Sequence, residues 1–325
     1  MDHARRRLLG MLAAAPALGL GVKAVASTST YPSTTVKIIV PFGPGSGSDV
    51  YARYFGQKLA DRVAQAVVVE NRGGAGGAIA VKALQSAPAD GHTILLGSNS
   101  PMAVNVPAYN ELSYDPVKDL RPLCGLSRSM AVIVVPNSSP IKTVEDLVAR
   151  GKQQPPLNMG TYSAGYQLAA APFLAKAGFK WQDINYKGLS QTTADVIGGQ
   201  VDVAVIDTPG SVHVVNSGQM RAIAVTGTER HPEMPDVPTL VEKGYDDAVH
   251  YSWTSLWMHA DTPDAIVEKI SGELLTILND PESAKFVSSK GGEIMPYGPK
   301  EMREFQLAEI QRFTKAVDAL GFQKI

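Results

Sequence analysis

The chain has 325 residues, of which 44% are apolar and 19% are charged, and this composition excludes a disordered or fibrous protein. Thirty lysines and arginines are balanced by 31 acidic residues, so the charge gives no indication of a nucleic-acid partner that would need a basic face. The single cysteine, Cys124, excludes an internal disulfide and a cysteine-rich zinc site, and the length favours two domains.

Residues 1–26 have the features of a secretory signal peptide. Three arginines at 5–7 precede an apolar run at 8–20, and Ala24-Val25-Ala26 is typical of a cleavage site. The run is too short to serve as a stable membrane anchor. Two arginines before apolar residues also fit a twin-arginine signal, so Sec and twin-arginine export both stay open. The mature chain is expected in the periplasm.

From residue 36 the chain alternates short apolar runs with helical patterns. Strands are expected at 36–40, 66–70 and 93–96, and helices at 49–62 and 79–86. The turns that follow these strands are rich in glycine and serine. This order predicts a mostly parallel sheet whose loops gather at the carboxyl ends of its strands.

A second α/β unit is expected to begin near residue 127. A last strand at 252–258 leads from this unit into two amphipathic helices. The chain is therefore expected to return to the first unit, so that residues 27–126 and 253–325 form lobe 1 and residues 127–252 form lobe 2. The other predicted strands are 130–135, 157–160, 184–186, 201–206 and 222–226, and helices are predicted from Thr143 and at 166–177, 191–197, 265–278 and 300–320.

The turn from Phe42 to Gly47 is the first candidate binding loop. With Glu70 at the end of the next strand it partly fits a dinucleotide fingerprint, but Val50 stands where the third glycine belongs. No Gly-Lys-Ser/Thr follows, so a P-loop is not predicted either. Free N–H groups at the start of a helix attract anions, and a tight turn without a ligand is the alternative. Candidate ligand-binding residues here are Phe42, Gly45, Ser46, Gly47 and Ser48, joined by Ser98 and Asn99 after the third strand.

The turn Thr161–Gly165 is the second candidate. Ser163 between a strand and a helix imitates the nucleophile elbow of hydrolases, and an acid and several histidines follow in the required order. An oxyanion segment of the HGGG type is missing. The same turn can donate hydroxyl and amide hydrogens to a carboxylate or simply cap the helix, so these alternatives stay open. Its candidate ligand-binding residues are Thr161, Ser163, Ala164, Gly165 and Tyr166, and the hydrolase partners are Asp207 and then His213, His231 or His250.

Two further positions complete the set of candidates. Tyr186 precedes Lys187 and Gly188 in a loop that can face a ligand. Asp207 follows a buried strand, where it can either bond a ligand hydroxyl or cap the next turn. The six histidines lack metal-binding spacings, so no metal and no cofactor are expected.

A series of motifs resembles the Bug family of periplasmic solute receptors, which are the substrate-binding components of tripartite tricarboxylate transporters. The opening Pro41-Phe42-Gly43-Pro44-Gly45, with Asp49 and Ala52-Arg53 after it, is similar to the family's P-F-x-P-G-G…D…A-R pattern. Matches continue in order along the whole mature chain. They are Val69–Gly77, Ala89–Gly91, Tyr114–Pro116 with Asp119-Leu120, Tyr186–Gly188, Gly198–Asp202, Arg221–Thr226 and Pro235–Thr239.

The resemblance implies an α/β fold, namely a two-lobed clamshell of the type II periplasmic-binding-protein kind. Each lobe is expected to be a mostly parallel sheet flanked by helices. The ligand, a di- or tricarboxylate with an aromatic dicarboxylate as one candidate, would be enclosed between the lobes and held by backbone amides, hydroxyls and water. The expected partners are this ligand and the membrane permease subunits. A monomer without enzyme activity is expected, and an exported serine hydrolase using Ser163 is the alternative.

The chain departs from the family pattern at the second turn, where Tyr166 replaces a small residue and no histidine follows. We expect its ring to cover the ligand, and Tyr166→Ala to weaken binding with little effect on fold stability; the alternative is that the ring packs only against the helix of its own lobe. The cleft loops contain no arginine clamp. The carboxylate is therefore expected on the backbone amides of residues 45–48, with Ser163 and Gly165 opposite.

Overall fold

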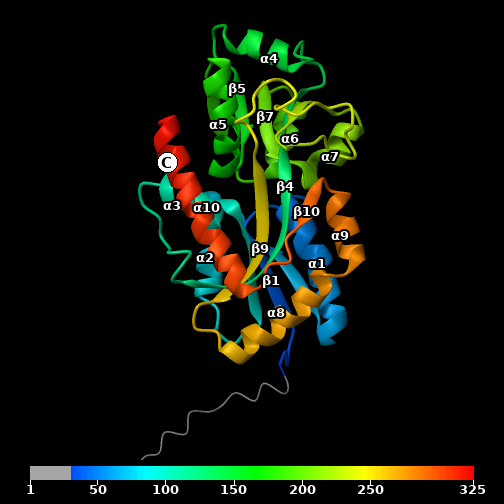
Figure 1. Ribbon diagram of the computed structural model, residues 1–325, viewed down its shortest axis with the longest axis vertical. Helices are drawn as coiled ribbons and strands as arrows, with labels where there is room; N and C mark the ends of the chain where they lie inside the picture. Colours follow the sequence, from blue (N-terminus) through cyan, green and yellow to red (C-terminus); the bar gives the residue numbers. More distant parts are fainter. Residues whose placement is uncertain (1–30) are drawn as a thin grey trace, which may run out of the picture.

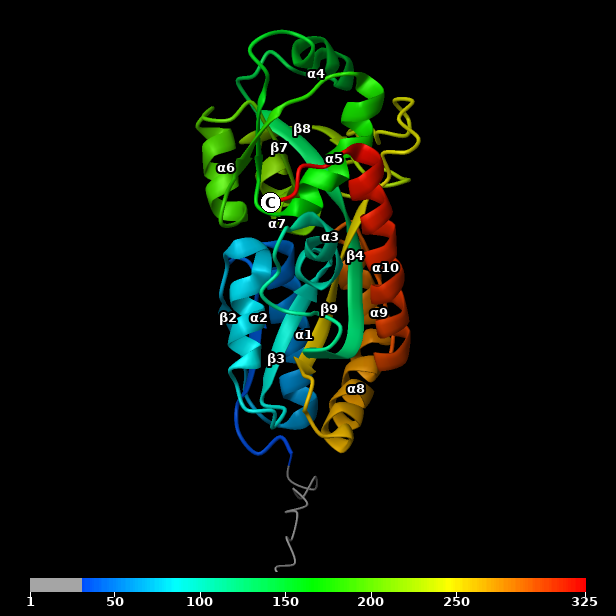
Figure 2. The same cartoon turned by 90° about the vertical axis from the view of Figure 1, so that its left-hand side faces the viewer.

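Two sheets follow each other along the long axis of the molecule, each with helices packed on it (Figures 1 and 2). The structure is a computed structural model that describes residues 31–325. The predicted signal peptide, residues 1–26, lies outside the described residues. We call the unit built on the first sheet lobe 1 and the unit built on the second sheet lobe 2.

Strand β4 (Leu120–Pro136) belongs to both sheets. In lobe 1 the order is β2-β1-β3-β9-β4, and β10 pairs with the other edge of β4 at residues 127–129. In lobe 2, β4 pairs with β7 and β8, and β5 lies between β7 and β6. The strand bounds are β1 Val36–Val40, β2 Val67–Asn71, β3 Thr93–Ser98, β5 Asn158–Thr161, β6 Gln182–Asn185, β7 Val203–Asp207, β8 Met220–Val225, β9 Tyr251–His259 and β10 Gly292–Ile294.

The α/β class and the two-lobed clamshell are confirmed, but both sheets are mixed where mostly parallel sheets were predicted. The strands β1, β2 and β3 are parallel, and so are β5, β6 and β7. The long strands β4 and β9 connect the two lobes and run antiparallel to their neighbours. A strand that leads the chain out of a lobe and one that leads it back must run in opposite directions, which is why the sheets are mixed.

The predicted helices are present within a few residues of their expected bounds. Apart from short helical turns, the parts that were not predicted are α3, α7, α9, β10 and the N-terminal half of β4. The helix bounds are α1 Gly47–Val63, α2 Ala78–Gln85, α3 Asn105–Ala108, α4 Val144–Gly151, α5 Ala164–Ala177, α6 Leu189–Ile197, α7 Thr208–Asn216, α8 Asp264–Leu278, α9 Pro281–Ser288 and α10 Pro299–Leu320, with short helical turns η2 Ala75–Gly77 and η3 Ser100–Val104.

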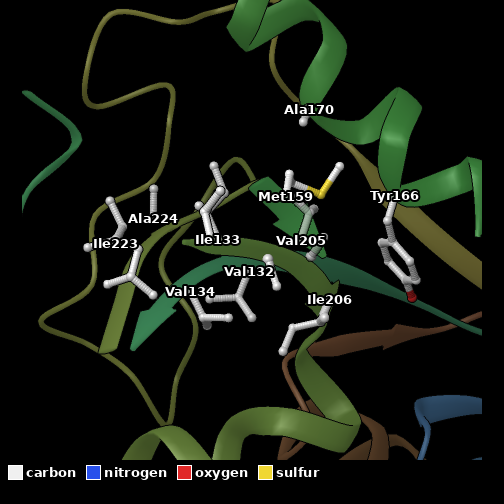
Figure 3. Packing of buried hydrophobic residues seen from close by; sticks show 14 of the residues in the cluster. Val132, Ile133, Val134, Met159, Tyr166, Ala170, Val205, Ile206, Ile223 and Ala224 are labelled. Carbon is white, nitrogen blue, oxygen red and sulfur yellow. The ribbon is translucent and has the colours of Figure 1, made fainter. Parts of the chain in front are cut away.

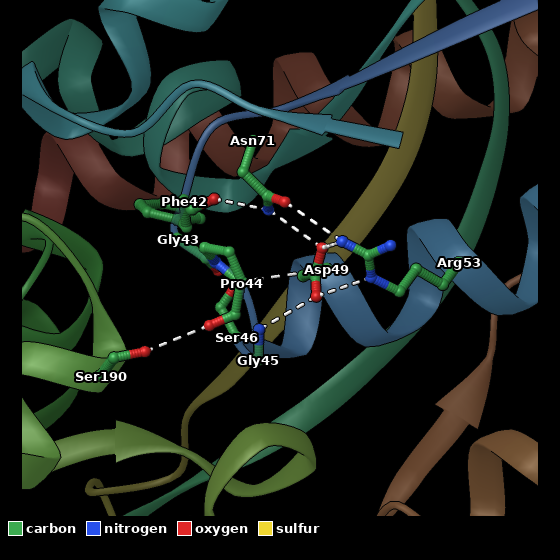
Figure 4. A network of polar contacts seen from close by, with 9 residues as sticks. All are labelled: Phe42, Gly43, Pro44, Gly45, Ser46, Asp49, Arg53, Asn71 and Ser190. Carbon is green, nitrogen blue, oxygen red and sulfur yellow. Dashed lines mark hydrogen bonds and ion pairs between the residues drawn. The ribbon is translucent and has the colours of Figure 1, made fainter. Parts of the chain in front are cut away.

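Helix ends follow local chemistry. Thr143 caps α4 in a capping box with Asp146, and Gly178 ends α5 in the left-handed conformation, both as the sequence predicts. The side chain of Ser46 caps α1 by accepting from the N–H of Asp49. The Asp49 carboxylate joins the β1–α1 loop to Asn71 and Arg53 (Figure 4).

Each lobe has its own hydrophobic core. The core of lobe 2 draws its buried residues from 130–248, with Phe42 as the one member from elsewhere (Figure 3). Two further clusters in lobe 1 draw theirs from 31–126 and 253–317, together with Ala164 and Leu168 of α5. The exact lobe boundaries, 27–126 with 253–325 and 127–252, stay a prediction.

Candidate functional site

A small cavity lies between the lobes, where the carboxyl ends of β1, β3 and β7 meet the start of α5. Its volume is about 30 Å³, room for on the order of two water molecules, so the lobes are closed tightly around it. The cavity is lined by hydroxyls and aromatic rings, and no lysine, arginine or histidine of the described chain is part of its wall. The lining residues are Phe42, Gly47, Ser48, Tyr51, Ser98, Asn99, Ser100, Ser127, Ser129, Tyr162, Ser163, Tyr166, Asp207, Pro209, Ser252, Trp253 and Thr254.

The connecting strands β4 and β9 form a hydroxyl-rich wall. Ser127 and Ser129 project from one face of β4, because alternate residues of a strand share a face. The Ser127 hydroxyl lies 2.9 Å from that of Thr254 on β9, and the Ser129 hydroxyl lies 2.8 Å from that of Tyr51 on α1. Burial raises the pKa of Tyr51 to about 12, so its hydroxyl stays protonated.

Ser98 and Asn99, at the end of β3, are two buried polar residues of the cavity wall whose side chains lack hydrogen-bond partners. Both are only 4% exposed, and within residues 31–325 the Ser98 Oγ and the Asn99 Nδ2 have no hydrogen-bond partner. A buried polar group without a partner costs about 1–3 kcal/mol. An acceptor entering the cavity would remove this cost.

The start of α5 faces the same two residues from lobe 2. Ser163 is its N-cap residue and makes no capping hydrogen bond. The N–H of Tyr166 donates to the Ser163 carbonyl at 3.1 Å, and the N–H groups of Ala164 and Gly165 lack acceptors within the helix. Gly165 lies close to Asn99, since a Cβ at this position would be 2.9 Å from the Asn99 Nδ2. This end of the cavity is therefore rich in donors and suits an anion.

Three of the four amides at the start of α1 that were expected to hold a ligand carboxylate, those of residues 45–47, donate to acceptors of the protein itself. The N–H of Gly45 donates to Asp49 at 2.9 Å, and that of Ser46 donates to the Gly43 carbonyl at 3.3 Å. The N–H of Gly47 donates to Asp207 at 2.9 Å. The protein's own acceptors thus satisfy these three donors, and Figure 4 shows the contact between Gly45 and Asp49.

Asp207 caps α7, which is one of the two roles expected for it. Its Oδ1 accepts from the N–H of Gly210 at 2.7 Å and from Gly47 across the cleft, and its Oδ2 accepts from the Tyr162 hydroxyl. Burial raises the pKa of Asp207, and the hydrogen bonds from Tyr162, Gly210 and Gly47 offset part of this effect.

Tyr166 lines the cavity and also belongs to the core of lobe 2. The side chain is buried in the lobe 2 core, and its hydroxyl lies 3.3 Å from that of Ser252 (Figure 3). Its ring packs 5.0 Å from the ring of Tyr162, which packs 5.4 Å from Phe42. Because removing a buried aromatic side chain typically costs about 3–5 kcal/mol, Tyr166→Ala should destabilise the fold, contrary to the expectation from sequence.

Eight of the predicted residues line the cavity and six do not. Those in the wall are Phe42, Gly47, Ser48, Ser98, Asn99, Ser163, Tyr166 and Asp207. Gly45, Ser46, Thr161, Ala164 and Gly165 lie in the same turns but outside the wall, and Tyr186 instead donates to Asp195 at 2.6 Å. Sequence reasoning missed Tyr162 and the serines of β4, although their alternation along the strand was a usable signal.

The serine-hydrolase alternative requires a histidine beside Ser163 that acts as the general base. None of the three candidate histidines is part of the cavity wall around Ser163. His231 packs against Gly291, and His250 lies beside the ring of Phe313. Among residues 31–325, no three His, Cys, Asp or Glu side chains gather as metal ligands would. No helix in the same range is long and apolar enough to cross a membrane.

Comparisons with known proteins agree on one family. The model of the tripartite tricarboxylate transporter family receptor matches residues 51–322. Protein BugT of Bordetella pertussis is 30% identical over 305 residues, which cover 93% of this chain and 94% of BugT. A solved R. palustris protein with adipate is 28% identical with a TM-score of 0.85, over 90% of this chain and 98% of that one. The periplasmic binding protein BugD is 26% identical with the same TM-score, over 91% of this chain and 100% of that one.

Proposed function

Because this chain belongs to the tripartite tricarboxylate transporter receptor family, we propose that it binds a small carboxylate between its lobes and delivers it to the membrane permease of such a transporter. It acts in the periplasm as a monomer without catalytic activity. The R. palustris relative solved with adipate supports a carboxylate ligand. The proposed hinge between residues 27–126 with 253–325 and residues 127–252 lets the lobes open for entry and release.

The observation that carries the proposal is the donor-rich end of the cavity. The unpartnered Ser98 Oγ and Asn99 Nδ2 face the start of α5, where Ser163 and the first N–H groups supply further donors. A carboxylate accepts several hydrogen bonds at once, and charged acceptors form the stronger ones. We place the ligand carboxylate here, without an arginine clamp.

For the remainder of the ligand we propose a di- or tricarboxylate, with an aromatic dicarboxylate as one candidate. The rings of Tyr162 and Tyr166 and the hydroxyls of β4 and β9 offer both apolar and polar contacts. The small cavity must widen to admit such a ligand, which the opening of the lobes allows.

A thermal-shift screen of aliphatic and aromatic mono-, di- and tricarboxylates, including adipate, tests the function. A ligand at 100 times its Kd should stabilise the protein by about 2.7 kcal/mol. If no carboxylate raises the Tm, the proposal fails.

The variant Asn99→Asp tests the carboxylate subsite, because it keeps the size of the side chain and replaces a donor with a negative charge. Loss of one charge-assisted hydrogen bond, worth about 1.5–3 kcal/mol, should raise the Kd at least tenfold in calorimetry. Asn110→Asp makes the same chemical change at an exposed position and should leave the Kd unchanged. An unchanged Kd in Asn99→Asp would move the subsite elsewhere.

The serine-hydrolase alternative is separated by a labelling experiment. A fluorophosphonate should leave Ser163 unmodified, and generic esters should not be hydrolysed, because no histidine of the cavity wall can take the serine proton. Covalent labelling of Ser163 would favour the hydrolase.

A further inference from the structure

The two lobes meet along a seam where backbone touches backbone. The β1–α1 loop of lobe 1 lies against the starts of α6 and α7 of lobe 2. The Ser190 hydroxyl donates to the Pro44 carbonyl at 3.2 Å (Figure 4), and a Cβ on Gly210 would lie only 2.5 Å from the Gly45 carbonyl oxygen. A Cβ on Gly188 would lie 3.4 Å from the Gly43 nitrogen. Glycines permit this close approach, because a side chain would hold the lobes apart.

Asp207 is the charged group at the centre of this seam. Its Oδ1 accepts from Gly210 in its own lobe and from Gly47, which lies 160 positions earlier in the chain and opens α1 of lobe 1. One carboxylate therefore serves the N-termini of two helices from two lobes, and both carry partial positive charge. The fit is close, because a Cβ on Gly47 would lie 2.7 Å from the Asp207 Oδ1.

Tyr162 holds the second oxygen of this carboxylate. Its hydroxyl donates to the Asp207 Oδ2, and its ring is fixed between Phe42 and Tyr166. Asp207 is only 4% exposed in the closed molecule. When the lobes open, the contact with Gly47 is lost while those with Gly210 and Tyr162, both in lobe 2, can persist. The contact between Gly47 and Asp207 thus distinguishes the closed conformation of the lobes from the open one.

We propose that Asp207 is a positioning residue that latches lobe 2 onto the N-terminus of α1, so that the protein's own carboxylate occupies this anion site in place of the ligand's. The inference rests on the proposed function and assigns separate roles to the two ends of the cavity. The α1 end of the cavity stabilises closure, and the end formed by Ser98, Asn99 and α5 binds the ligand. Because the latch touches protein on both sides, it should strengthen the binding of every ligand by the same factor.

The test removes the contact between Asp207 and Gly47 by a substitution in one lobe or the other, and measures ligand binding and closure of the lobes. Asp207→Ala deletes the carboxylate, and Gly47→Ala pushes it away from the α1 N-terminus. Each variant should raise the Kd about tenfold or more, and by the same factor for every carboxylate that binds. Stopped-flow measurements should show that the increase comes from faster dissociation. The Kd of the double variant should be no higher than that of the single variant with the higher Kd, because both changes remove the same contact. Thr143→Ala, which removes the cap of α4 at the end of lobe 2 far from the seam, is the control and should change the Kd less than twofold.

Small-angle X-ray scattering without ligand measures closure directly. Asp207→Ala should have a larger radius of gyration than the wild type, a result that stands even if no carboxylate binds and the proposed function fails. If Asp207→Ala does not fold, Tyr162→Phe, which removes a single donor to the latch, should show the same effects in weaker form. The latch is refuted if radius and Kd stay unchanged. It is also refuted if the change in Kd depends on the ligand's charge, because Asp207 would then touch the ligand.

Discussion

Two buried polar residues of the cavity differ in role because their side chains differ in hydrogen-bond partners. Asp207 and Asn99 are both 4% exposed polar residues in the same cavity. Asp207 receives three protein donors, whereas the Asn99 Nδ2 has no partner within the described chain. A satisfied group supports the structure, and an unsatisfied donor is available to a ligand. For this reason we assign closure to Asp207 and ligand binding to Asn99.

His250 should make the protein sensitive to mild acid. Burial, with a smaller contribution from the charge of Arg312, lowers the pKa of His250 to about 3. In the unfolded chain a histidine takes up its proton near pH 6.5, so its contribution to stability is complete above that pH and is lost as the pH falls toward 3. Between pH 6.5 and 5 this loss amounts to about 2 kcal/mol.

Urea unfolding of the wild type and of His250→Leu between pH 7 and 5 measures this effect. The variant should keep about 2 kcal/mol more of its stability over the interval than the wild type does. The contribution of His231, whose pKa burial also lowers, is common to both proteins and cancels in the comparison. Equal slopes would contradict the assignment to His250.

At the scale of elements, the N-termini of helices supply hydrogen-bond donors. The capping of each N-terminus decides which of its N–H groups remain available to a ligand. The start of α1 is capped by Ser46 and Asp207, and that of α4 by a complete capping box. The start of α5 has no side-chain cap and faces Asn99. Among these three, α5 is the helix whose first N–H groups receive no side-chain cap.

Thr143→Ala should lower stability without touching the ligand. The Thr143 hydroxyl accepts from the N–H of Asp146 at 3.1 Å, and losing such a cap costs about 1 kcal/mol. Helix α4 lies at the end of lobe 2 far from lobe 1 (Figure 1), so the Kd should stay the same. Chemical denaturation and calorimetry on the same variant check both statements, and a changed Kd would contradict this separation.

Gly165→Ala should weaken binding without lowering stability. Alanine is the better helix former by about 1 kcal/mol, but its Cβ would lie 2.8 Å from the Ser100 Oγ and 2.9 Å from the Asn99 Nδ2. We expect a Kd at least tenfold higher with an unchanged or higher free energy of unfolding. Gly272→Ala in α8, where a Cβ meets nothing within 4 Å, is the matched control and should change stability alone.

At the scale of the whole molecule, two long strands connect the lobes and also line the site. The first part of β4 pairs with β9 up to Met130, and its last residues pair with β7 and β8. Helix α5 of lobe 2 packs against α10 of lobe 1 on one side of the cavity (Figure 2), and the Asp207 seam lies on another. Opening about β4 and β9 would separate both contacts.

Hydrogen exchange with and without ligand tests this picture. Protection should increase in the four turns that meet at the cavity, 41–48, 98–104, 161–166 and 207–211, because closing the lobes restricts their opening. The outer helix α4 should exchange at the same rate in both states. Uniform protection over the whole chain would contradict closure of two rigid lobes.

The sequence alone determined the family, the α/β class and most helices and strands, because periodicity, caps and motifs are local signals. It also located the turns that reach the cavity. Which donors of those turns remain free was decided by tertiary structure. The Gly47 amide is taken by a carboxylate 160 positions away, and β4 extends to the cavity wall because β9 pairs along its length. Contacts between distant segments depend on how the lobes pack, and no local pattern encodes them.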